Sequence, residues 1–145
     1  MNKLTDIEAY LNENGSVTYS NTGTSMKPLL RQGKDVFTVE KLPPPYSPGD
    51  VVLYRRASGA LVLHRIVGKD ENGYILLGDN LTKREYGVKE ENILGVMTSF
   101  TRGGKTYSVK DAPYRLYSAF CTRLFPVRIA LKKAAHLSKN IFSHK

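Results

Sequence analysis

Apolar residues in the first 111 positions of the chain fall in short runs, several of which alternate with polar residues as half-buried strands do. Turn-forming pairs such as Ser58-Gly59, Asn72-Gly73 and Gly103-Gly104 separate these runs and favour hairpins. We therefore expect a mainly β domain of antiparallel strands, closed or folded over so that its edges are hidden. The expected strands span residues 16–21, 36–40, 51–55, 61–67, 74–77, 93–100 and 106–109.

Two segments have helical rather than strand spacing. The sequence Thr5-Asp6-Ile7-Glu8 is a capping box and predicts a short helix over residues 5–14, ending near Gly15. From Pro113 onward apolar residues recur at helical spacing, and we expect Pro126 to divide this tail into two helices because it removes a backbone donor. The chain is thus divided into a β domain with its N-terminal helix, residues 1–111, and a basic amphipathic helical tail, residues 112–145. The expected apolar stripes of the tail are Tyr117, Phe120 and Leu124, and then Val127, Leu131, Ala134 and Ile141.

Length and composition restrict the class of protein. The 145 residues suffice for one domain, and a hydrophobic content of 41% is ordinary for a globular chain. Acidic residues interrupt the start of the chain, unlike a secretory signal peptide, and no apolar run approaches the roughly 18 residues of a membrane span. We therefore expect a cytoplasmic or peripherally membrane-associated protein. The single Cys121 and three scattered histidines indicate no metal site, and no cofactor is expected.

The net charge of +9 is unevenly distributed along the chain. Seven Lys and Arg residues and no Asp or Glu lie between Ala112 and Lys145. Basic residues beside aromatic and aliphatic ones suit an anionic membrane surface, so peripheral contact through residues 113–145 is one interpretation. An equally weighted alternative is that the tail covers apolar surface of the β domain while its basic side is simply solvated. No specific nucleic acid is expected as a partner, because no nucleic-acid-binding motif accompanies the charge.

Three polar residues become candidates for catalysis when they are considered together. Taken singly, Ser25 could cap a turn, His64 could be a packed strand residue, and Asp79 could be a turn residue. If the hairpin that follows His64 is centred between residues 70 and 71, His64 faces Leu77 and Asp79 lies diagonally beside it. The carboxylate would then hold one ring nitrogen of the imidazole, and the other nitrogen would accept the proton of the Ser25 hydroxyl.

Four segments also resemble a known family. GTSMKPLL, GDVVLYR, LVLHRIVG and LLGDN occur in the order and approximate spacing of the conserved boxes of type I signal peptidases. The resemblance covers residues 22–97 and is strongest to the serine–histidine branch of archaea and the endoplasmic reticulum, within the wider group that includes LexA-like self-cleaving repressors. It implies a β-barrel-type peptidase fold with Ser25 as nucleophile and His64 as general base. It also implies acidic partners at Asp79 and at Glu85, where the family usually has Asp.

The sequence departs from this family pattern at three places. Only a short helix precedes Ser25, whereas family members have membrane-spanning helices. Leu29 replaces the usual Thr, and Gly23 lies where some relatives have a serine that stabilises the oxyanion. The Ser25 N–H is therefore expected to act with a second donor, for which Thr22 and Thr24 are candidates. The expected site-forming residues around the nucleophile are Gly23, Thr24 and Met26.

The function predicted from these features is serine endopeptidase activity on an extended peptide or preprotein with small residues next to the cut. Two alternatives stay open. A LexA-like self-cleaving regulator needs a DNA-binding module ahead of the peptidase part, and only 24 residues precede Ser25. A catalytically inactive β domain that binds peptide or a membrane surface would retain Ser25 and His64 without their chemistry.

Overall fold

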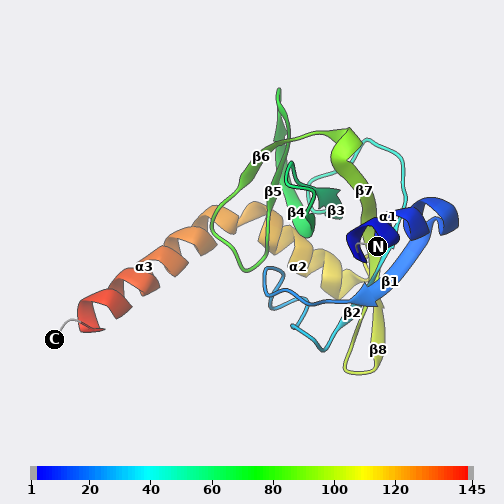
Figure 1. Ribbon diagram of the computed structural model, residues 1–145. Helices are drawn as coiled ribbons and strands as arrows, with labels where there is room; N and C mark the ends of the chain where they lie inside the picture. Colours follow the sequence, from blue (N-terminus) through cyan, green and yellow to red (C-terminus); the bar gives the residue numbers. More distant parts are fainter. Residues whose placement is uncertain (1–2, 144–145) are drawn as a thin grey trace.

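The computed structural model describes residues 3–143 of the chain, with side chains for residues 6–140. Its main feature is an eight-stranded sheet in the order β1-β2-β7-β3-β4-β5-β6, with β8 paired to β7 and every pairing antiparallel. The mainly β fold with an N-terminal helix and a helical tail is confirmed (Figure 1). The strands are β1 (Ser16–Ser20), β2 (Val36–Glu40), β3 (Val51–Arg55), β4 (Leu61–Asp70), β5 (Gly73–Leu77), β6 (Glu85–Val88), β7 (Ile93–Arg102) and β8 (Lys105–Ser108). The helices are α1 (Lys3–Asn14), the short 3-10 helix η1 (Glu90–Asn92), α2 (Ala112–Arg123) and α3 (Phe125–Ser143).

The sheet is open, so the expectation of a barrel-type closure is wrong. β1 and β6 stand at the two ends of the strand order, and no pairing joins them within residues 3–143. Both end strands are short, with five residues in β1 and four in β6, which limits the unpaired backbone that each edge presents. α1 packs beside β1 and buries Leu11 in the core. Short strands and a helix therefore protect the edges in place of closure.

Apolar side chains form a core on each face of the central strands, because successive strand residues point to opposite faces. On β3, for example, Leu53 belongs to one cluster and its neighbours Val52 and Tyr54 belong to the other. This double burial explains why β3 is a continuous apolar run rather than an alternating one. The first cluster includes Met26, Leu30, Phe37, Leu63, Phe100 and Tyr114, and the second includes Ile66, Tyr74, Leu76, Ile93 and Val96.

Most of the expected strands lie at the expected positions. β2 and β3 have the predicted bounds, and the other predicted strands differ only at their ends. β6 was not predicted, because its sequence EYGV is short, contains glycine and has no clear alternation. It forms by pairing with β5, where Glu85 faces Leu76. Two predicted features, the capping residue Thr5 and the stripe residue Ile141, lie outside the described side chains.

The β4–β5 hairpin has a different register from the one expected. Asp70 pairs with Gly73, which moves the centre of the turn along the chain, and the pairing shifts again between Ile66 and Gly68. Arg65 therefore faces Leu77, and the prediction that His64 does so is wrong. Neighbouring strand residues point to opposite faces of the sheet, so in this register Arg65 shares a face with Leu77 and His64 lies on the other face.

The tail forms two helices, as predicted, with the break at Leu124, just before Pro126. Tyr114 and Cys121 of α2 are buried, so α2 packs on the sheet domain, whereas α3 extends away from the sheet (Figure 1). No helix among the described residues has the length and apolar content needed to cross a bilayer. The division of the chain into domains at residues 111 and 112 stays a prediction.

Candidate functional site

Ser25 lies in the turn that connects β1 to β2. It lines a hollow of about 370 Å³ that is also lined by His64 and Arg56. A larger groove of about 520 Å³, between the proline-rich loop and α2, contains neither Ser25 nor His64. The structure thus places the predicted nucleophile and base in one pocket, although no hydrogen bond joins them within the described part of the chain.

Buried side chains fix the turn that carries Ser25. Met26, the next residue, is buried in the first core cluster, so its main contribution is to anchor the turn. Asn21 is also buried, and its side-chain amide donates to the carbonyl oxygens of Gly23 at 2.9 Å and Leu30 at 3.3 Å. These bonds tie the beginning of the turn to its end, which restricts the backbone on both sides of Ser25.

The loop of residues 78–81 packs directly against the Ser25 turn. The backbone N–H of Asn80 donates to the Ser25 carbonyl oxygen at 2.8 Å, and its side-chain amide donates to the Thr24 carbonyl oxygen at 3.1 Å. A Cβ atom at Gly78 would lie 2.8 Å from the Ser25 carbonyl oxygen, so the close approach requires glycine. Gly78 and Asn80 therefore position the Ser25 turn, a role that was not predicted for them from the sequence.

His64 is oriented by a tyrosine rather than directly by a carboxylate. Its Nδ1 lies 3.2 Å from the hydroxyl oxygen of Tyr54, and that hydroxyl donates to Oε2 of Glu85 at 2.6 Å. Nδ1 itself is 4.0 Å from Oε1 of Glu85, and Arg56 forms an ion pair with the same carboxylate. Tyr54 and His64 stand on the paired strands β3 and β4, and Glu85 begins β6.

This series of hydrogen bonds determines which ring nitrogen of His64 carries the proton. The Tyr54 hydroxyl has a single hydrogen, which is used in the bond to Glu85. The tyrosine oxygen can therefore only accept from the imidazole, so Nδ1 carries the hydrogen and Nε2 keeps its lone pair. An imidazole in this tautomer is able to accept a proton at Nε2.

Burial keeps the His64 imidazole neutral at physiological pH. His64 is 2% exposed, and burial lowers its pKa to about 4, although the nearby Glu85 charge acts in the opposite direction. Burial alone would raise the pKa of Glu85, but hydrogen bonds from Arg56 and Tyr54 bring it below its usual value. Burial, followed by the bond to Glu85, raises the pKa of Tyr54, so the tyrosine keeps its proton. The site therefore combines a neutral histidine, a protonated tyrosine and an ionised glutamate.

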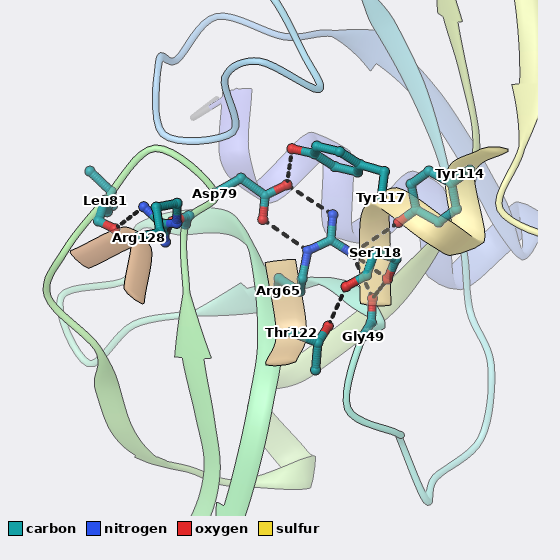
Figure 2. Close-up of polar contacts among 10 residues, drawn as sticks. Gly49, Arg65, Asp79, Leu81, Tyr114, Tyr117, Ser118, Thr122 and Arg128 are labelled. Atoms are coloured by element: carbon teal, nitrogen blue, oxygen red, sulfur yellow. Dashed lines mark hydrogen bonds and ion pairs between the residues drawn. The ribbon is translucent and has the colours of Figure 1, made fainter. Parts of the chain in front are cut away.

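Asp79 is the counter-ion of Arg65 and not of His64 (Figure 2). The Arg65 guanidinium donates to both carboxylate oxygens at 2.8 Å, and the Tyr117 hydroxyl donates to Oδ2 of Asp79 at 2.8 Å. Arg65 is 0% exposed and Asp79 is 5% exposed, so the ion pair is buried. The expectation that Asp79 holds the His64 ring is wrong, because the hairpin register places Arg65 opposite Leu77. Of the two acidic candidates, Glu85 is the one linked to His64.

The helices of the tail also hold the 78–81 loop. In α2, Tyr117 reaches Asp79, as described above (Figure 2). In α3, Arg128 donates to the Leu81 carbonyl oxygen at 2.7 Å, and Lys132 donates to the backbone and side-chain oxygens of Asn80. Arg128 and Lys132 of α3 therefore pack the tail on the loop that contacts Ser25.

The Ser25 turn also offers free backbone donors. Within the described residues, the N–H groups of Thr24, Ser25 and Met26 have no hydrogen-bond acceptor. Donors placed beside a nucleophile can stabilise the oxyanion that forms during acyl transfer. A Cβ atom at Gly23 would meet nothing within 4 Å apart from its chain neighbours, so the space beside this part of the turn is open.

Comparison with known proteins gives no assignment. No model of a protein family matches the chain, and no curated protein matches it. Among the described residues, no group of three or more His, Cys, Asp or Glu side chains is placed to hold a metal ion.

The residues that orient the candidate site residues were not predicted, although the sequence contained an indication of some of them. Tyr54 lies in an expected buried strand, and a buried tyrosine hydroxyl usually has a hydrogen-bond partner. Arg65 lies between buried strand positions, where an unpaired charge would be costly, so a carboxylate partner could have been sought. No comparable local signal indicated Arg56, because its role depends on β6, which was not predicted.

Proposed function

We propose that the chain is a serine endopeptidase in which Ser25 is the nucleophile and His64 is the general base. The observation that carries the proposal is the pocket shared by the two residues, together with the Tyr54–Glu85 pair that leaves Nε2 of a neutral His64 able to accept a proton. A serine that only caps a turn would not need a histidine in the same pocket.

The proposed reaction follows the usual course of acyl transfer. The Ser25 hydroxyl oxygen bonds to the carbonyl carbon of the peptide while its proton passes to Nε2 of His64. The free N–H groups of residues 24–26 stabilise the oxygen that becomes negative. The proton then passes to the departing amine, and a water molecule, deprotonated by His64, releases the acyl group from Ser25.

The substrate class in this proposal is an extended peptide or preprotein with small residues beside the cut. The support is the resemblance of residues 22–97 to type I signal peptidases, whose pattern includes both Ser25 and His64. Shallow pockets would select small side chains because larger ones clash with their walls.

Labelling with a fluorophosphonate tests the proposal, because this reagent modifies activated serine hydroxyls. We expect intact-mass analysis to find one label per chain, absent in Ser25→Ala and strongly reduced in His64→Gln. Ser20→Ala is the matched control, since Ser20 lines the same pocket, and it should label like the wild type. A folded wild-type protein that resists labelling would contradict the proposal and favour a catalytically inactive binding domain.

A further inference from the structure

The helix α3 is bound to the rest of the protein by its polar side. Arg128 and Lys132 contact the carbonyl oxygens of the 78–81 loop, and Ile129 beside them is buried. These residues share one side of the helix, because positions three or four apart along an α-helix lie on the same face. The opposite side of α3 must therefore face away from the β domain, which reverses the usual orientation of an amphipathic surface helix.

The side of α3 that faces away from the β domain carries apolar residues, and α2 exposes further apolar residues. Six large hydrophobic residues of the tail are between 45% and 74% exposed, and we call them the tail stripe. Among the described residues outside the tail, only three other large hydrophobic side chains are exposed. Exposed apolar surface is thus concentrated on one appendage, which is typical of an interaction surface. The tail stripe consists of Leu116, Phe120, Leu124, Val127, Leu131 and Leu137.

The charge of the tail indicates which kind of partner the tail stripe fits. Exposed basic residues accompany the tail stripe, and the sequence from Ala112 to Lys145 contains no acidic residue. A second copy of the chain would bring like charges together, which opposes self-association through this surface. An anionic surface would attract the same charges. The exposed basic residues that do not contact the 78–81 loop are Arg115, Arg123, Lys133 and Lys139.

We propose that the tail stripe docks the protein on an anionic lipid surface. The apolar side chains enter the boundary between headgroups and acyl chains, while the basic residues are attracted to the anionic headgroups. The polar side of α3 stays bound to the 78–81 loop, so docking requires no rearrangement of the tail. The proposal does not depend on peptidase activity.

Flotation with lipid vesicles tests the proposal. The full chain should float with vesicles that contain phosphatidylglycerol at low salt, float less at high salt because exposed charges are screened, and float little with pure phosphatidylcholine. Leu131→Glu should weaken binding to the anionic vesicles at least about tenfold, because it removes apolar contact and adds a repulsive charge. Leu131 is 68% exposed, so the variant is expected to fold.

Tyr10→Glu is the matched control, since Tyr10 is an exposed apolar residue on another helix, and it should bind like the wild type. Equal binding to anionic and neutral vesicles, or undiminished binding of Leu131→Glu, would overturn the proposal. Sedimentation of the protein without vesicles tests whether the tail stripe mediates self-association instead. A dimer that Leu131→Glu dissociates, without any vesicle binding by the wild type, would assign the stripe to self-association and also overturn the proposal.

Discussion

The Tyr54 hydroxyl group links the His64 ring to the ionised Glu85, with one hydrogen bond to each. Its removal in Tyr54→Phe leaves Nδ1 without its acceptor, so the ring is free to rotate and to change tautomer. We expect kcat/KM for a peptide substrate to fall about ten- to hundredfold, with little change in the circular dichroism spectrum.

Tyr46→Phe provides the comparison for that measurement. The Tyr46 hydroxyl donates to the Leu42 carbonyl oxygen at 3.0 Å, and Tyr46 does not line the pocket of Ser25. This variant should keep wild-type activity. If both tyrosine variants behave alike, the hydroxyl of Tyr54 has no part in orienting the base.

Residue identity pointed to Ser25 and His64, which line one pocket, but could not assign the residue that orients His64. The sequence supplied two acidic candidates, and the choice between them depended on the hairpin register. The pairing is irregular near Gly68, and although a glycine within a strand can mark a bulge, it does not specify the register on either side.

At the scale of elements, the contact between the 78–81 loop and the Ser25 turn should control activity. In Gly78→Ala the new Cβ atom would lie 2.8 Å from the Ser25 carbonyl oxygen, so the two segments must separate. We expect kcat/KM to fall about a hundredfold, because small displacements of a nucleophile are costly. The free energy of unfolding should fall by about 1–3 kcal/mol, measured by urea denaturation.

Gly23→Ala is a control within the same turn. Its added Cβ atom meets no other atom within 4 Å, so both stability and activity should stay close to wild type. Should Gly78→Ala be as active as Gly23→Ala, the loop does not position the nucleophile.

Elements with strong periodicity were predictable from the sequence, and those made by tertiary contact were not. β2 and β3 have clear apolar patterns, and their bounds were predicted correctly. The break between α2 and α3 was also predicted, since the effect of Pro126 is local. β6 exists because β5 offers an edge to pair with, which local sequence does not reveal.

For the whole molecule, burial of neutral His64 makes stability depend on pH. The pKa of His64 is about 4 in the folded protein, whereas an unfolded histidine titrates near 6.5. The unfolded chain therefore binds more protons between these values, so stability should fall as pH decreases from about 6.5 to 4, by about 3 kcal/mol. The pKa of Glu85 is also lowered in the folded protein, so protonation of Glu85 at acidic pH should reduce the stability further.

Urea denaturation at a series of pH values measures this dependence, and His64→Gln isolates the contribution of the histidine. The variant should show a shallower decline between pH 6.5 and 4 than the wild type. Parallel curves for the two proteins would mean that the imidazole is not held neutral by burial.

The position of α3 in the chain also has a consequence for protein synthesis. Ribosomes deliver the chain from its N-terminus, so Ser25, His64 and the 78–81 loop emerge well before Arg128 and Lys132. Until those two residues have been synthesised, the loop lacks the hydrogen bonds that they donate to Leu81 and Asn80. A nascent chain of the proposed peptidase would therefore carry its nucleophile in an incompletely supported turn. Competence would come only after α3 has been made and has docked on the loop.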